Sequence, residues 1–213
     1  MEVVYSRNTN NFIKENEING FYGDLLDLIN FGTDVEGIIY DDDWTVKRFL
    51  NGLRIKINER VKSVFNYLEL DIKILNKKIK ELSKTDLKFV LLAYLILHNH
   101  KNIIFDYFDV GLIYKDQKKL ARVIRNLKND GFSILIISNN LVFLDTIVEN
   151  LYVINKGNVV YSGNMKELIK DNSKYIEEPE ILRFIEMSNK KGANLDYTLD
   201  SKELLKDIYR SVY

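Results

Sequence analysis

Short, continuous apolar runs rich in β-branched residues constrain the fold of this chain more than any other feature. The clearest are residues 102–105 (NIIF), 133–137 (SILII) and 151–154 (LYVI), the last followed across a Lys156-Gly157 turn by residues 158–161 (NVVY). A further run is residues 37–40 (GIIY). Because these runs are continuous rather than alternating, they predict strands that are covered on both faces, as in parallel α/β sheets.

Amphipathic helical patterns lie between and beyond these runs. Residues 116–130 place four apolar side chains on one helix face, and Gly131 directly after them is a helix-end signal. The four residues are Leu120, Val123, Ile124 and Leu127. With the apolar runs before and after it, this segment predicts a strand–helix–strand unit with a right-handed crossover. Shorter helices are predicted at residues 24–31 and 141–149.

Two further regions are predicted to be helical. Residues 46–88 contain two lysine-rich amphipathic segments, 46–68 and 72–82, without any strand pattern, and we expect a small helical subdomain there. Pro179 is the only proline in the chain, and it predicts the start of a C-terminal pair of helices at residues 180–189 and 201–209. We therefore predict a main domain at residues 1–175, with the helical subdomain at about 46–88, and a C-terminal helical extension at 176–213.

Composition excludes several classes of function. The chain has no cysteine, which excludes disulfides, thiolate chemistry and cysteine-bound zinc. Its formal net charge is +0, so nothing in the overall charge favours nucleic acid or an anionic membrane. The first residues lack the features of a signal peptide, and the longest apolar run, residues 89–97, is far shorter than the roughly 20 residues of a membrane span. We expect a cytoplasmic protein that reaches a membrane only through partners.

Charged residues and histidines offer little sign of a metal site. Residues 1–45 carry 10 acidic and 2 basic side chains, whereas residues 46–101 carry 13 basic and 5 acidic ones, so the two regions either pair, solvate their own surfaces or face different partners. Asp41, Asp42 and Asp43 lack the spaced oxygens of a calcium loop, and we expect a solvated acidic loop. His98 and His100 fall in the predicted turn before residue 102, and we expect no metal there either.

Residues 81–163 carry motifs in a familiar order. They contain LSKTD at 82–86, NIIFD at 102–106, Gly-Leu-Ile at 111–113, Asn139 after the run SILII, and NKGNVVYSG at 155–163. In order and spacing this stretch resembles the second half of an ABC-type ATPase. Such proteins have an LSGGQ helix, a Walker B strand ending in Asp-Glu, a D-loop, a switch histidine and a hairpin of the form N-K-G-x-V-x-x-x-G. The resemblance implies an α/β, P-loop NTPase (RecA-like) ABC ATPase fold.

The residues that would handle ATP are mostly replaced. Asp106 matches the Walker B aspartate, which in the family holds magnesium through water. Tyr107 stands where the family has the glutamate that polarises the attacking water, and a phenol with a pKa near 10 cannot serve as that base at neutral pH. Asn139 takes the place of the switch histidine and cannot carry a proton. Asp41 lies at about the place of the Q-loop glutamine.

The LSGGQ position keeps only its leucine and serine. Ser83 is retained, but Lys84 and Thr85 replace glycines whose backbone N–H groups would approach the γ-phosphate. Asp86 adds a charge that repels phosphate. We therefore expect this segment to be a weakened cap for a nucleotide rather than an intact one.

The phosphate loop GxxxxGK[ST] is absent from the sequence. Its expected place is residues 17–29 (EINGFYGDLLDLI), which keep Gly20 and Gly23 but contain no lysine. Asp24 sits where a cation should meet phosphate, and a carboxylate at a helix N-terminus neutralises the dipole that would attract an anion.

These replacements predict an ABC transporter ATP-binding-cassette-like subunit that does not hydrolyse ATP on its own. We expect no catalytic residue and no metal site, with Gly20, Gly23, Ser83, Asp106 and Asn139 as remnants of the cofactor-binding residues. The partners implied by the resemblance are a second ABC ATPase subunit and a membrane-spanning permease subunit, with no nucleic acid. No cofactor is expected on the chain alone, but ATP and magnesium are expected at a site shared with an intact partner.

The C-terminal segment indicates one type of transporter within the family. Residues 178–208 are similar to the C-terminal helical extension of energy-coupling-factor ATPases. Two alternatives remain at this stage: a free-standing regulatory or interaction protein that retains the fold, and an ATPase with atypical motifs.

Overall fold

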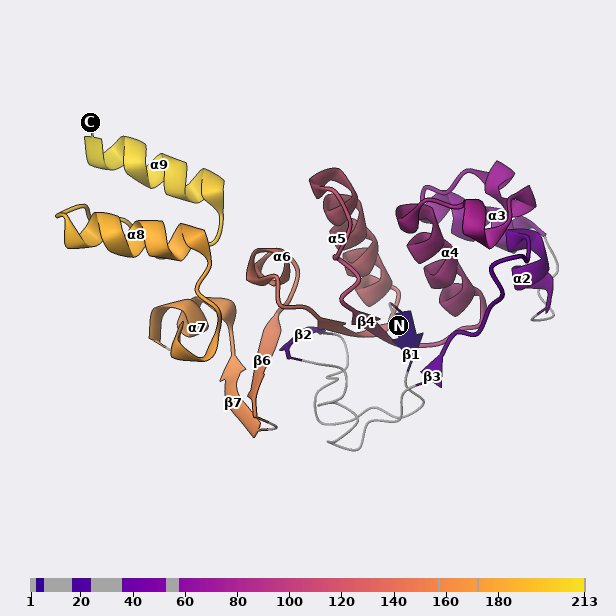
Figure 1. Ribbon diagram of the computed structural model, residues 1–213, viewed down its shortest axis with the longest axis horizontal. Coiled ribbons are helices and arrows are strands. Elements are labelled where there is room, and N and C mark those ends of the chain that lie inside the picture. The colour runs from indigo at the N-terminus through magenta and orange to yellow at the C-terminus, as the bar shows by residue number, and fades with distance from the viewer. Residues whose placement is uncertain are drawn as a thin grey trace.

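A mixed sheet with a parallel centre organises the computed structural model, which describes residues 3–5, 17–23, 36–52, 58–156, 158–171 and 173–212. Over these residues the strand order is β3-β1-β4-β5-β2-β6-β7. Figure 1 shows β3 and β7 at the two sides of the sheet. The strands are β1 (Val3–Tyr5), β2 (Ile18–Tyr22), β3 (Glu36–Gly37), β4 (Asn102–Asp106), β5 (Ser133–Ile137), β6 (Asn150–Asn155) and β7 (Asn158–Gly163). Strands β4, β5, β2 and β6 are parallel neighbours, and the antiparallel pairs lie at the two sides of the sheet.

The strands predicted from apolar runs 102–105, 133–137, 151–154 and 158–161 are confirmed as β4, β5, β6 and β7. The prediction for residues 37–40 is wrong beyond Gly37, since β3 comprises only Glu36–Gly37. Its partner β1 pairs with β3 only through Val4 and Tyr5, and Ile39 is 89% exposed, so the apolar run leaves the sheet after its first residue, Gly37.

Strand β2 was not predicted, although it lies in the middle of the sheet. It pairs in parallel with β5 on one side and β6 on the other, and Gly20 lies opposite Ile136 and Leu151. A Cβ atom at Gly20 would lie 2.7 Å from Cγ1 of Val148. Gly20 is therefore a strand residue that lets the segment after α6 approach the sheet, and not a residue of a loop around phosphate as the sequence suggested.

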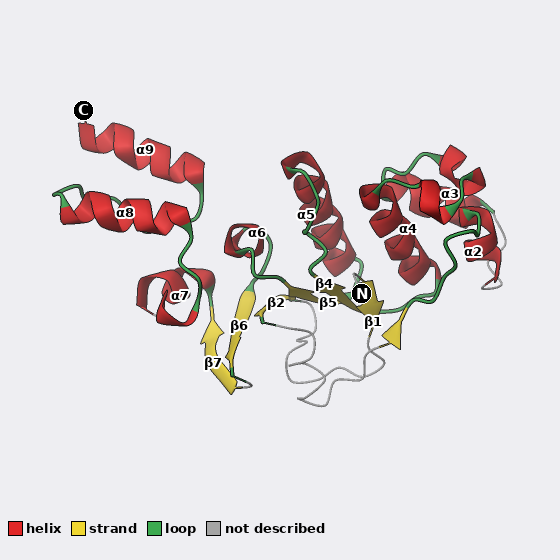
Figure 2. Ribbon diagram, viewed as in Figure 1, coloured by secondary structure: helices red, strands yellow, loops and turns green. Residues whose placement is uncertain are grey.

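The helices follow the predicted regions closely. They are α2 (Val46–Gly52), α3 (Glu59–Tyr67), η1 (Ile72–Asn76), η2 (Ile79–Glu81), α4 (Lys84–Leu97), α5 (Tyr114–Asn129), α6 (Leu141–Asp145), α7 (Met165–Asp171), η3 (Ser173–Tyr175), α8 (Glu180–Lys190) and α9 (Ser201–Val212) (Figure 2). The helical region from residue 46, the crossover helix α5 and the C-terminal helices α8 and α9 are confirmed. The helix predicted at residues 24–31 lies outside the described residues.

Two helical details differ from the prediction. Helix α6 ends at Asp145 rather than at residue 149, because the chain must reach β6, where Asn150 pairs with Asn19 of β2. Helix α7 was not predicted. Figure 1 places α2–α4 at one end of the molecule and α8 and α9 at the other, and the domain boundary at residue 175 stays a prediction. None of the described helices is both long and apolar enough to span a membrane.

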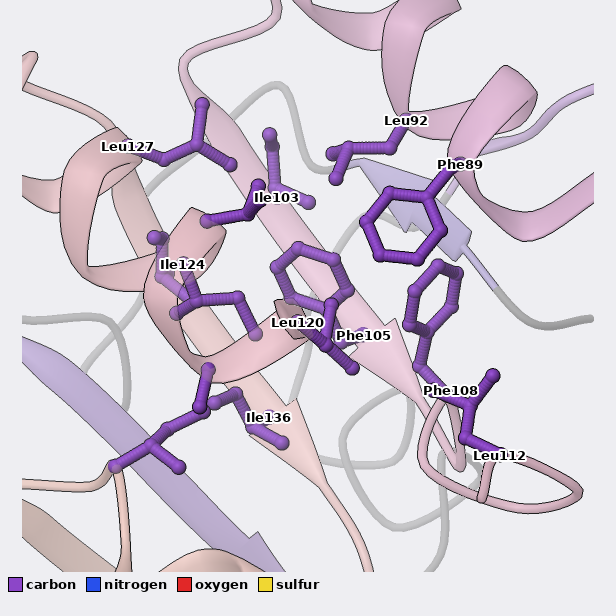
Figure 3. Close-up of a cluster of buried hydrophobic side chains, with 14 of the residues drawn as sticks. Phe89, Leu92, Ile103, Phe105, Phe108, Leu112, Leu120, Ile124, Leu127 and Ile136 are labelled. Atoms are coloured by element: carbon purple, nitrogen blue, oxygen red, sulfur yellow. The ribbon is translucent and has the colours of Figure 1, made fainter. Parts of the chain in front are cut away.

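Apolar side chains bury the central strands on both faces, as the continuous runs predicted. On one face, α4 and α5 pack against β4 and β5, with Phe89, Phe105, Leu120 and Ile124 completely buried (Figure 3). Residues on the other face of β2, β4, β5 and β6 form a second cluster: Phe21, Ile104, Leu135, Ile137, Tyr152 and Ile154. Each fully buried Leu, Ile or Phe side chain stabilises the fold by about 1.5–3 kcal/mol.

Close packing at Gly20 gives a first prediction. Gly20→Ala should lower the free energy of unfolding by about 1–3 kcal/mol, because the new methyl group overlaps the Val148 side chain. Urea denaturation measures the change. Gly20→Ala should cost less stability when it is introduced into Val148→Ala than when it is introduced into the unchanged chain, because the shorter side chain leaves room for the new methyl group. Equal stability of Gly20→Ala and the unchanged chain would contradict this explanation of the packing at β2.

Candidate functional site

The carboxyl ends of β2, β4 and β5 meet at one edge of the sheet. Phe21, Asp106 and Ile137 are level in the strand register. In open α/β sheets, ligands bind in the crevice outside the carboxyl ends of the strands. The fold therefore brings Gly23, Asp106 and Asn139, three of the predicted site residues, to the same edge.

Tyr107 crosses this edge. Its backbone N–H donates to the carbonyl oxygen of Ile137 at 2.9 Å, and its phenol donates to the carbonyl oxygen of Gly23 at 2.9 Å. Strands β4 and β2 flank β5, so they lie roughly 9–10 Å apart. The half-buried Tyr107 ring spans that interval and packs against the second apolar cluster. The phenol that replaces the family's glutamate thus occupies the edge between Asp106 and Gly23.

The backbone at Tyr107 is itself unusual. Its φ is 47°, in the left-handed region that residues other than glycine rarely adopt. Such a conformation persists only where surrounding contacts impose it. Here the contacts include the hydrogen bonds to Ile137 of β5 and to Gly23, which follows β2, and the packing of the ring.

Asp106 and Asn139 have different surroundings. Asp106 ends β4 and is only 9% exposed, whereas Asn139 is exposed. The polar contacts after β5 are made by Ser138, whose Oγ accepts from the N–H of Asn140, and by Asn140, whose Oδ1 accepts from the N–H of Phe143 and caps α6. Neither residue was predicted from the sequence, although an Asn before the apolar residues 141–144 is a helix-start signal.

Ser83 belongs to the start of α4 rather than to the sheet edge. Its Oγ accepts from the N–H of Asp86 at 3.0 Å and donates to the Asp86 carboxylate at 2.9 Å. The hydroxyl proton that a phosphate would need is therefore directed to Asp86. The Asp86 carboxylate in the first turn also interacts favourably with the helix dipole, so the N-terminus of α4 is stabilised by side chains of the same chain.

Part of the predicted phosphate loop is described. Gly20 lies inside β2, and Gly23 follows the strand at the carboxyl edge, where its carbonyl accepts from Tyr107. Residues 17–23 contain no lysine. Asp24 and the rest of the segment up to residue 29 lie outside the described residues.

The acidic loop and the histidines have protein partners. Asp43 forms ion pairs with Lys80 at 2.6 Å and Lys78 at 3.4 Å, and these two ammonium groups lower the pKa of its carboxyl group. This contact joins the acidic and basic regions noted in the sequence. The His98 ring contacts the Tyr94 ring at a tilt of 34°, with ring centroids 4.4 Å apart. Burial lowers the pKa of His98, with a smaller effect from Arg60. In the described part of the chain, no group of three acidic, His or Cys side chains is arranged to hold a metal.

A cavity of about 600 Å³ lies away from this edge, between α7 and α9. Its lining includes Lys166 and Lys170 of α7 and Glu203 and Asp207 of α9. None of the predicted nucleotide-binding residues lines this cavity.

Comparison with known proteins identifies the fold and the relatives. No protein-family profile matches the chain. It is 28% identical over 123 residues to a xylose/arabinose import ATP-binding protein of Sulfolobus acidocaldarius, covering 58% of this chain and 48% of that protein. It is 32% identical over 114 residues to an uncharacterized ABC transporter ATP-binding protein of Bacillus subtilis, covering 52% and 38%. It is 27% identical over 119 residues to the energy-coupling factor transporter ATP-binding protein EcfA2 of Streptococcus agalactiae, covering 54% and 42%. The matched region thus spans about half or less of each relative.

Solved structures agree with these relatives. A nucleotide-free ATP-binding cassette from an ABC transporter superposes with a TM-score of 0.60 at 17% identity, covering 87% of this chain and 99% of that one. CbiO1 of Clostridium perfringens, part of the ABC transporter complex cbiONQ, superposes with a TM-score of 0.61 at 15% identity, covering 86% and 98%. The fold of this chain is therefore the P-loop NTPase fold of ABC ATPase cassettes, and its sequence relatives are ABC transporter ATP-binding proteins.

The bond across the edge gives a second prediction. Tyr107→Phe should lower the free energy of unfolding by about 1 kcal/mol, because the Gly23 carbonyl loses its donor while the ring packing stays. Chemical denaturation followed by circular dichroism measures the change. Tyr114→Phe is the matched control, since Tyr114 is 67% exposed, and equal effects of the two substitutions would show that the Tyr107 phenol stabilises nothing.

Proposed function

We propose that this chain is an ABC transporter subunit that does not hydrolyse ATP alone and supports an intact ATP-binding partner. The observation that carries the proposal is the bond from the Tyr107 phenol to Gly23. In the family, this edge holds the attacking water, its general base and the phosphates. Here a neutral phenol takes the base's position and is bonded to the residue where the phosphate loop would begin.

Charge at two positions, the start of α4 and the phosphate-loop segment, supports the same proposal. Asp86 interacts with Ser83 at the start of α4, where a negative charge repels phosphate. At the phosphate-loop position, residues 17–29 supply no lysine, and the first lysine after them is Lys47 in α2. A triphosphate at this chain's own phosphate-loop position would therefore lack the lysine that neutralises it, and a triphosphate held by a partner would meet the Asp86 carboxylate.

A two-chain arrangement gives the subunit a role without hydrolysis. In ABC pairs, each ATP lies between the phosphate loop of one subunit and the LSGGQ segment of the other. In a pair with an intact sibling, this chain would offer Ser83 to ATP and magnesium held by the sibling's phosphate loop. Ser83 would have to exchange its hydrogen bond to Asp86 for one to phosphate, which makes it a weakened rather than an absent cap.

Partner binding is the second part of the proposal. Val110, Ile113 and Tyr114 beside the sheet edge are 60%, 66% and 67% exposed, and Phe184, Met187, Leu205 and Tyr209 on the C-terminal helices are 49–66% exposed. Exposed apolar groups of this kind are typical of protein interaction sites. We assign the partners as a second ABC ATP-binding chain and a membrane-spanning permease, at the inner face of the membrane. The similarity to an energy-coupling-factor ATP-binding protein favours that transporter type.

ATP turnover with and without the sibling tests this function. The chain is mixed with an intact ABC ATP-binding chain from the same organism, and phosphate release is measured for each chain alone and for the mixture. We expect no turnover by this chain alone and turnover in the mixture. Tyr107→Glu should not give the chain activity of its own, because the phosphate-loop lysine is still missing.

Substitution of Ser83 separates a shared site from simple activation. Ser83→Ala should reduce ATP turnover of the mixture about tenfold, because the bond from Ser83 to phosphate is lost. Because Ser83 also caps α4, turnover is measured under conditions where the variant is shown to be folded. Ser63→Ala, at an exposed position of α3, is the control. Phosphate release by this chain alone at the rate of an intact ATPase would contradict the proposal.

A further inference from the structure

Lys88 is the one completely buried lysine or arginine in the described ranges. It lies in the second turn of α4, with 0% of its surface exposed. Burying an ammonium group is unfavourable unless hydrogen bonds replace its water. Its surroundings therefore show what the buried charge does.

Backbone carbonyls of the loop after β4 surround the Lys88 ammonium. Nζ donates to the carbonyl oxygen of Phe108 at 2.8 Å and to that of Val110 at 2.6 Å. It also lies 5.2 Å from the centroid of the Phe108 ring, within the range of a cation–π interaction. The two carbonyls flank Asp109, which is only 3% exposed, so α4 holds this loop from the inside.

The loop has a tightly turned backbone. The backbone N–H of Val110 donates to the carbonyl oxygen of Tyr107 at 3.1 Å, and that of Leu112 donates to the carbonyl oxygen of Asp109 at 3.1 Å. These bonds form two successive turns. Gly111 has a φ of 78°. Without the Lys88 ammonium group, the carbonyl oxygens of Phe108 and Val110 would each lose one hydrogen bond while the loop kept this backbone conformation. A buried polar group without a partner lowers the stability of that conformation.

Apolar packing alone leaves part of the loop free. Phe108 and Leu112 insert into the core beside Phe89 and Phe105, with ring centroids of Phe108 and Phe105 5.2 Å apart (Figure 3). Val110, between these two anchors, is 60% exposed and gains little from burial. The bond from Lys88 to its carbonyl therefore fixes the part of the loop that packing does not.

A second, more exposed link runs beside the first. Thr85 Oγ1 donates to the Asp116 carboxylate at 3.1 Å, and Gln117 Nε2 donates to the Leu112 carbonyl at 3.3 Å. These bonds are partly buried, as is the bond from Lys88 to Val110, whereas the bond from Lys88 to Phe108 is buried, so water competes least with that one. Lys88 is thus the buried polar connection between α4, the last helix of the helical region, and the sheet edge that carries Tyr107.

We propose that Lys88 is a positioning residue whose ammonium group locks the loop at residues 107–112 onto α4. The lock makes the helix that begins after Ser83 and the edge closed by Tyr107 and Gly23 one rigid unit. This role belongs to the free chain and is independent of whether the chain pairs with an ATP-binding partner.

Amide hydrogen exchange on the free chain tests the lock. Lys88→Met keeps the side-chain length and removes the ammonium group. We expect the amides of Val110 and Leu112 to exchange about tenfold faster, because the turns that protect them lose their anchor. Amides in the centre of β5 should change less than about twofold. Unchanged exchange in the loop, or an equal rise throughout the core, would overturn the proposal.

A chemical rescue distinguishes the charge from packing. The chain has no cysteine, so Lys88→Cys can be alkylated at that single position with 2-bromoethylamine in denaturant and then refolded. The product carries an ammonium group at the length of lysine, and loop protection should return to within about twofold of the unchanged chain. Failure of the aminoethylated protein to recover protection would also overturn the proposal.

Lys119→Met is the matched control for the loss of a lysine near α4. Lys119 Nζ lies 4.3 Å from the Phe89 ring centroid and donates to the Glu69 carbonyl, which lies outside the loop. Loop exchange in this variant should match that of the unchanged chain. Loop exchange as fast as in Lys88→Met would show that any nearby lysine has the same effect and would contradict a specific role for Lys88.

Discussion

Burial of β4, β5, β2 and β6 on both faces is the constraint on which the rest of the structure depends. It requires continuous apolar strands, helices packed on the sheet and a parallel arrangement that brings the carboxyl ends of β2, β4 and β5 to one edge. Any chain with this arrangement presents a crevice at that edge. What the crevice does then depends on the few residues that follow each strand.

In this chain those residues bond to one another. The Tyr107 phenol donates to the carbonyl oxygen of Gly23. Ser138 accepts from the N–H of Asn140 in the turn before α6. The Ser83 hydroxyl donates to the Asp86 carboxylate at the start of α4. Groups that bind phosphate in intact cassettes must have free N–H or O–H donors directed outward. Here the serine hydroxyl already donates within the chain, and a carboxylate adds opposing charge. These contacts are the physical basis for the proposed role as a supporting subunit.

The sequence predicted the elements whose stability is local or whose apolar pattern is uninterrupted. Strands β4 to β6 were found because buried strands have continuous apolar runs, and helix α5 because an amphipathic helix has a clear periodicity. Strand β7, whose residues are exposed or half-buried, was found from its apolar residues after the Lys156-Gly157 turn. Strand β2 was missed because Asn19 and Gly20 interrupt its apolar pattern; the first is buried and donates to the Ile134 carbonyl, and the second makes room for Val148. The motif spacing placed Asp106 and Asn139 at the edge. The reach of Tyr107 to Gly23 could not be predicted, because it depends on the strand order β4-β5-β2, which no local pattern encodes.

Isothermal titration of magnesium ATP into the purified chain alone tests the central claim most directly, because it measures whether this edge accepts a nucleotide at all. The account predicts no saturable heat of binding up to about 1 mM ATP, which corresponds to a binding free energy weaker than about −4 kcal/mol. Saturable binding with a micromolar Kd would contradict it, and would mean that a phosphate-binding site exists despite the contacts of Tyr107 and Asp86.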